Sequence, residues 1–202
     1  MRKKNVKLWE HLLRELKDFE IQAGWFENTR YDADTPIAGI AATQNYGAEI
    51  SNPGGQPYYI NSSTGLAVFV SKTSLFGQHL IAKGQVTKPH TITIPPRPFM
   101  DNAKKRIQGA EGKEILMQEM LRVFEGRQTM EQAASRLKEW LKNIIQEEIT
   151  KLQSPPLKRS TVRNREKRYI SKAKKQNPVT TAKPLVDTGL MLETVQGKYE
   201  LK

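Results

Sequence analysis

The sequence contains no cysteine and only three histidines among its 202 residues. Without cysteine, a disulfide or a thiolate-bound metal site is excluded. The three histidines, His11, His79 and His90, lie far apart in the sequence and form no HxxxH or HxxE spacing. We therefore expect no histidine metal site and no cofactor, while a metal site built from carboxylates alone stays open.

Long apolar runs are also missing from the chain. No stretch approaches the roughly 18 apolar residues that a membrane-spanning helix needs, so we expect no contact with a membrane. The chain starts with the basic residues Arg2, Lys3 and Lys4, but apolar residues recur at helical spacing from Val6 onward. Because a secretory signal has an uninterrupted apolar region, we expect none here and expect an intracellular protein at synthesis.

Acidic residues are scarce in one region of the second half. Residues 158–175 contain nine basic residues and a single acid, Glu166, so this basic segment has a net charge of +8 out of +12 for the chain. The basicity is therefore a local patch rather than a general property. The basic residues of this segment are Lys158, Arg159, Arg163, Arg165, Lys167, Arg168, Lys172, Lys174 and Lys175.

The first half of the chain alternates between helical and strand patterns. Val6, Trp9, Leu13 and Leu16 recur at steps of three and four, which predicts an amphipathic helix over residues 5–19 that docks on another surface. A strand is predicted over residues 20–26, and an alanine-rich helix over 37–46, capped by Asp34 or Thr35 and closed by Gly47. Residues 58–61 and 66–71 flank a turn and predict a hairpin, and residues 91–94 predict a short strand. Residues 74–84 are ambiguous.

The second half is predominantly helical. Residues 98–153 predict helices interrupted at Gly126, and Thr129 with Gln132 predicts a capping box for the last of them. Pro155 and Pro156 end that helix. These patterns predict an α+β fold, in which an antiparallel sheet packs against the alanine-rich helix and the long helices.

We expect a single domain over residues 1–202. Within it, residues 52–88 predict a β-hairpin insertion, and residues 154–183 predict a basic extended segment. Beyond that segment, Asp187 or Thr188 is expected to cap a short helix or to begin a closing strand.

Four segments, in this order, resemble the tail-completion or virion-morphogenesis proteins of tailed phages. Residues 37–47 form an alanine-rich helix that ends in Tyr-Gly, and residues 94–100 read Ile-Pro-Pro-Arg-Pro-Phe-Met. Residues 154–161 read Ser-Pro-Pro-Leu-Lys-Arg-Ser-Thr, and residues 183–191 read Lys-Pro-Leu-Val-Asp-Thr-Gly-Leu-Met. The resemblance covers about residues 35–195. The stretch 52–88 is longer than the family pattern requires, which suggests an insertion directed toward a partner.

The resemblance implies a structural protein of the phage neck rather than an enzyme. Such a protein forms a ring, expected to be hexameric, that joins the tail to the head around the DNA channel. Its partners would be copies of itself, the tail terminator or tail tube, the head-side connector, and genomic DNA bound without sequence specificity. It would lie in the virion, and in the host cytoplasm during assembly.

The basic segment has three open interpretations: contact with DNA phosphates, contact with an acidic protein, or a solvated loop. Tyr169 is its only aromatic residue, so stacking on bases is poorly supported. Arg97 is a further candidate for contact with DNA or a partner, since its guanidinium suits an acidic group across an interface. A free-standing nucleic-acid-binding protein that uses residues 158–175 is the alternative function.

Asp187-Thr188-Gly189 is the triplet of aspartic proteases. That chemistry needs two carboxylates that share a proton, and a protease domain needs further elements after the triplet. Only 13 residues follow Gly189, so we expect Asp187 and Thr188 to cap an element and Gly189 to permit a turn.

Overall fold

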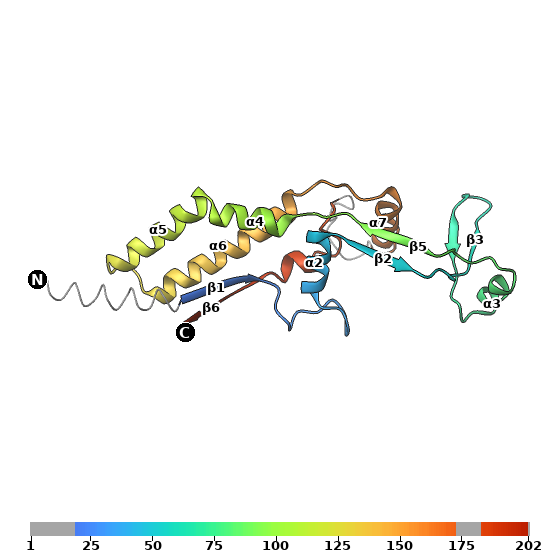
Figure 1. Ribbon diagram of the computed structural model, residues 1–202, viewed down its shortest axis with the longest axis horizontal. Helices are drawn as coiled ribbons and strands as arrows, with labels where there is room; N and C mark the ends of the chain where they lie inside the picture. The colour runs from blue at the N-terminus through green and yellow to red at the C-terminus, as the bar shows by residue number, and fades with distance from the viewer. Residues whose placement is uncertain (1–18, 173–182, 202) are drawn as a thin grey trace, which may run out of the picture. The chain divides into compact units, whose positions relative to one another are not determined.

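The computed structural model describes residues 19–172 and 183–201, with the side chains of residues 167–172 and 201 left out (Figure 1). The chain divides into two compact units. One comprises the residues up to Tyr46 together with those from Pro95 onward, and the other comprises Gly47–Ile94. The predicted helix over residues 5–19 lies almost wholly outside the described residues.

Three helices pack together in the first unit: α4 (Phe99–Gln108), α5 (Ala110–Phe124) and α6 (Met130–Lys151). The predicted capping box of α6 is confirmed, because Thr129 Oγ1 accepts from the Gln132 amide while the Thr129 amide donates to Gln132 Oε1. Gly126, with φ of 70°, makes the predicted break between α5 and α6.

Two strands distant in the sequence pair beside α6. Strand β1 (Phe19–Gly24) runs antiparallel to β6 (Gln196–Leu201), with Phe19 opposite Leu201. Both strands contact α6. A Cβ atom at position 197 would collide with the Lys138 side chain, so Gly197 allows the close approach of β6 to the helix.

The main core lies between α2 (Ile37–Tyr46), α4, α6 and the C-terminal segment. Phe99 is fully buried, and its ring meets Trp25 edge to face at 6.0 Å. Trp25 Nε1 donates to the Met191 carbonyl at 2.9 Å, which ties the β1 side of the core to the C-terminal segment. The buried members of this core are Ala41, Phe99, Ala103, Ile144, Ile145, Ile149, Leu185, Val186 and Val195.

The basic segment contains a helix where the sequence analysis expected extended chain. Residues Arg159–Lys172 form α7, so the extended interpretation is wrong for this stretch. The prediction of an extended chain rested on the high positive charge of the segment. Lysine and arginine nevertheless have good helix propensity, and Pro156 precedes the helix rather than interrupting it. Further on, a short helix α8 (Leu190–Glu193) and then β6 follow Gly189, but the N-cap of α8 is Gly189 and β6 begins at Gln196, so neither Asp187 nor Thr188 takes the predicted position.

The second unit holds two strand pairs and one helix. Strand β2 (Ala48–Asn52) pairs with β5 (His90–Ile94), and β3 (Tyr58–Ile60) forms the predicted hairpin with β4 (Ala67–Phe69). The ambiguous stretch after residue 74 is helix α3 (Leu75–Ala82), whose N-cap Ser74 accepts from the Gly77 amide. The predicted insertion over residues 52–88 falls within this unit.

The predicted α+β class is confirmed. The strands of the described residues do not form the one sheet that the sequence analysis expected, but three separate antiparallel pairs. The pairs β1–β6 and β2–β5 join segments distant in the sequence, and such pairings leave no local signal.

Candidate functional site

Arg165 of α7 is buried, with 7% of its surface exposed. Its Nη1 donates to the carbonyls of Lys183 at 2.7 Å and Val186 at 3.2 Å, and its Nη2 donates to that of Pro184 at 3.3 Å. Its Nε lies 3.4 Å from Asp187 Oδ1. Arg165 therefore holds the C-terminal segment against α7. The prediction that it contacts DNA or a partner is wrong, because its side chain is buried within its own chain.

The Asp187-Thr188-Gly189 triplet has a structural role in this fold. The Asp187 carboxylate faces Arg165, and Thr188 Oγ1 accepts from the Leu190 amide at 3.3 Å. Gly189 has a φ of 82° and occupies the N-cap position of α8. The triplet thus turns the chain into α8, as expected for Gly189, while the expected cap by Asp187 and Thr188 is wrong because Gly189 itself is the N-cap.

Arg97 is also buried, with 4% of its surface exposed. Its Nη1 donates to Gln44 Oε1 at 2.9 Å, and its Nε donates to the Pro155 carbonyl at 3.2 Å. Burial lowers the pKa of Arg97, and the nearby charge of Arg165 lowers it further. The expected contact of Arg97 with DNA or a partner is corrected, because its guanidinium joins three segments of its own chain.

A pocket of about 240 Å³ lies beside Arg165. Its walls include Tyr31, Ile37, Ile40 and Leu190. The Arg165 guanidinium also lines it, but its donors already serve backbone carbonyls. The pocket therefore presents mainly apolar walls rather than an anion site.

Among the basic side chains of this segment that the structure describes, the exposed ones lie at the start of α7. Lys158, Arg159 and Arg163 are exposed and are available to a partner of opposite charge. Lys167, Arg168 and Lys172 belong to α7, but their side chains lie outside the description. Lys174 and Lys175 lie outside the described residues altogether. Of the predicted contacts, three are thus placed at the surface and two are buried.

The second unit has an unusually apolar surface. Leu75 is 87% exposed, and Phe69 is 62% exposed. Leu80 and Pro57 are its buried apolar side chains, although all residues of the unit, 47–94, are described. Its other exposed large apolar residues are Ile50, Ile60, Leu66, Phe76, Ile81 and Ile92. We call this set the apolar surface of the second unit. Ile50 lies opposite Ile92 in the β2–β5 pair, and Leu75 and Phe76 are neighbours in α3. Exposed apolar residues grouped in this way favour a protein partner.

The sequence analysis missed this surface. Alternating apolar residues in short strands predict burial on one face, and the sequence alone does not show that no further layer covers that face. The signal that was present is the shortness of β3 and β4, at three residues each, because hairpins of this size are not stable alone.

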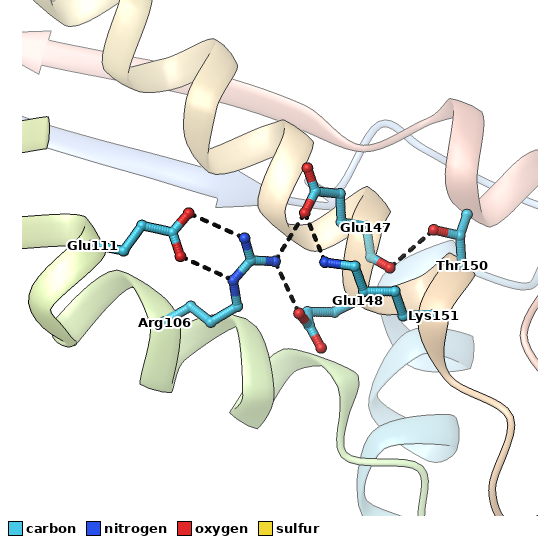
Figure 2. Close-up of polar contacts among 6 residues, drawn as sticks. All are labelled: Arg106, Glu111, Glu147, Glu148, Thr150 and Lys151. Atoms are coloured by element: carbon cyan, nitrogen blue, oxygen red, sulfur yellow. Dashed lines mark hydrogen bonds and ion pairs between the residues drawn. The ribbon is translucent and has the colours of Figure 1, made fainter.

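Arg106 links α4, α5 and α6 on the first unit (Figure 2). Its guanidinium makes a two-pronged contact with Glu111, with Nη2 at 3.1 Å and Nε at 3.2 Å from the carboxylate oxygens. Its Nη1 donates to Glu147 at 3.0 Å and Glu148 at 2.9 Å. These hydrogen bonds raise the pKa of Arg106. Lys151 and then Arg106, by their hydrogen bonds, lower the pKa of Glu147. This cluster fastens the helices together, since every acid in it faces a cation.

Across the described ranges 19–172 and 183–201, no group of three or more histidine or acidic side chains is arranged to hold a metal ion. In the same part of the chain, no helix is long and apolar enough to cross a membrane. The described residues instead provide two surfaces for contact with other molecules, namely the cations at the start of α7 and the apolar surface of the second unit.

No protein-family model, curated protein or solved structure matches this chain.

Proposed function

We propose that this protein is a structural subunit of the neck of a tailed phage, where a ring of its copies joins the tail to the head-side connector around the DNA channel. The order of the four segments that resemble tail-completion proteins supports the family. The fold supports an assembly role over catalysis, since the aspartic-protease triplet and both buried arginines hold the chain together.

The observation that carries the proposal is the apolar surface of the second unit. Folding of a unit this small needs more apolar burial than Leu80 and Pro57 supply, so contact with another subunit would stabilise it. The proposed partner for this surface is a neighbouring protein of the neck. The unit matches the stretch that the family pattern does not require, as expected for a module specific to one partner.

The test is electron microscopy of particles made without this protein. We expect filled heads and finished tails that stay separate, while normal virions would refute the joining role. Supplying Leu75→Glu in trans should fail to restore joined particles, since a buried carboxylate at the contact is costly. The matched control is Gln78→Glu, which adds the same charge at an exposed polar position of α3 and should restore them.

A second candidate function is non-specific binding to nucleic acid. The exposed positions of Lys158, Arg159 and Arg163 favour it, because clustered cations at a helix start contact phosphates without reading sequence. Within the neck, the same cations would face the DNA in the channel, so the two functions differ in whether the isolated protein binds DNA.

A further inference from the structure

A tight turn at the end of α5 brings Arg122 and Arg127 to the same pocket. The Gly126 amide donates to the Val123 carbonyl at 3.0 Å, and the Arg127 amide donates to the Arg122 carbonyl at 2.8 Å. With Gly126 at a φ of 70°, these two hydrogen bonds form the Schellman turn that often ends a helix. The turn therefore joins an arginine of the last helical turn to an arginine of the following loop.

A third arginine, Arg136, reaches this pocket from α6. Thr129 caps α6, and Gln132, Ser135 and Arg136 follow at steps of three and four on one side of the helix. These three side chains, the arginines of the turn and Tyr199 of β6 line an open pocket of about 680 Å³. We call it the arginine pocket.

A nearly buried carboxylate, Glu119 of α5, positions two of the arginines. Its side chain is 10% exposed, and Gln128 Nε2 donates to its Oε2 at 2.8 Å. Arg122 Nη1 donates to Glu119 Oε1 at 2.7 Å, and Arg136 Nη1 lies 3.6 Å from Oε2. Glu119 is not among the residues that line the pocket. One carboxylate behind two guanidinium groups therefore fixes their positions and leaves positive charge at the pocket wall.

The donors of these arginines are available to a ligand, unlike those of Arg165. A guanidinium has five N–H donors. Among the described residues, Arg122 and Arg136 each contact one carboxylate through Nη1 alone, and Arg127 contacts Glu125 through Nε at 3.2 Å. The side chains of Arg122, Arg127 and Arg136 are 44%, 71% and 57% exposed. Their remaining donors can therefore bind a ligand in the pocket.

The charge and geometry of the pocket suit a phosphate group. Three positive side chains line it against one acid, Glu131. The two coplanar oxygens of a carboxylate match the fork of a single arginine, whereas the tetrahedral oxygens of a phosphate can accept from several guanidinium groups at once. The Ser135 hydroxyl adds a further donor to the wall.

We propose that the arginine pocket binds phosphate groups, either of a free polyphosphate compound or of a nucleic-acid backbone. The site lies on the first unit, apart from the apolar surface of the second unit that carries the neck function. It is tested on the isolated protein, so its failure would leave the neck function standing.

The test is calorimetric titration of the full chain with sodium tripolyphosphate at low salt. Arg127→Gln with Arg136→Gln removes two guanidinium groups from exposed positions, so the urea unfolding curve should stay close to that of the parent. We expect the affinity to fall by at least about tenfold, because charge-assisted hydrogen bonds to phosphate are lost. Arg127→Lys with Arg136→Lys should recover only part of the affinity, since an ammonium group lacks the fork.

The matched control is Lys104→Gln with Lys113→Gln. It removes the same charge at exposed positions of α4 and α5, and its affinity should stay within about twofold of the parent. An equal loss in the control and in the glutamine double variant would show that net charge alone attracts the ligand, and would overturn the site.

Two further titrations identify the source of the phosphate. If the glutamine double variant also binds short duplex DNA more weakly than the control does, the pocket takes backbone phosphates. If only tripolyphosphate binding is weakened, it takes a free phosphate compound. Polyglutamate at the same charge concentration should not displace tripolyphosphate, and displacement would favour an acidic protein and overturn the proposal. Unchanged binding by the double variant, or a parent that binds neither phosphate ligand, also overturns it.

Discussion

At the scale of single residues, arginine does its work inside this protein as well as on its surface. Arg165 reaches three backbone carbonyls and a carboxylate, and Arg97 joins Gln44 to the turn at Pro155. The guanidinium has five donors in a planar fork, so one side chain can hold several irregular segments in place. The segment around residues 183–187 depends on this, because it has no sheet partner there.

Replacing Arg165 should therefore destabilise the C-terminal segment. Arg165→Ala leaves the carbonyls of Lys183, Pro184 and Val186 without that donor, and we expect a loss of about 2–4 kcal/mol in the free energy of unfolding. Arg165→Lys should recover part of it, since an ammonium group cannot span the same acceptors. Urea titration measures both, and an unchanged Arg165→Ala midpoint would contradict the role.

The Arg106 cluster predicts a pH dependence. The pKa of Glu147 is lowered in the folded chain, so its contacts stabilise the fold above the ordinary value of 4.5 and are lost as pH falls through the lowered value. Glu147 is largely solvated, so Glu147→Gln should cost less than about 1 kcal/mol at pH 7. At a pH below the lowered pKa of Glu147, where this carboxyl is neutral, the variant and the parent should unfold at the same urea concentration. A difference that persisted there would show that charge is not the cause.

At the scale of elements, sequence motifs that lie within a few residues predicted the structure better than any signal for pairing between distant segments. The helix over residues 37–46, the hairpin and the capping box of α6 are confirmed, because their signals lie within a few residues of one another. The pairs β1–β6 and β2–β5 and the burial of Arg97 and Arg165 depend on partners farther along the chain. Charge alone suggested contact with DNA or an acidic partner for those arginines, and only their neighbours in space show otherwise.

The capping box gives a prediction at this scale. Thr129→Ala removes the acceptor for the Gln132 amide and leaves an unpaired donor at the start of α6, so we expect a loss of about 1 kcal/mol. Thr129→Ser keeps the hydroxyl and should stay within a few tenths of the parent in thermal or urea unfolding. If the alanine and serine variants unfold alike, the cap contributes nothing.

At the scale of the whole molecule, charge separates the two candidate functions. Reversing Lys158, Arg159 and Arg163 to glutamate should weaken any binding of duplex DNA by the isolated protein, and the remaining binding should depend less steeply on salt. Reversing Lys104, Lys105 and Lys113 is the matched control, since these lysines are exposed and lie on other helices. If the α7 triple variant loses DNA binding but still joins heads to tails, the cations do not serve the neck.

The pairing of β1 with β6 has a consequence for biosynthesis. Phe19 leaves the ribosome early, and Leu201, its partner in the strand pair, leaves it much later. Until β6 has been synthesised, β1 has no strand partner and the side of α6 that β6 contacts stays uncovered. The nascent chain therefore exposes both surfaces until translation is nearly complete. Chains that stop before residue 196 would keep that surface open, which makes premature termination a route to aggregation rather than to a smaller working subunit.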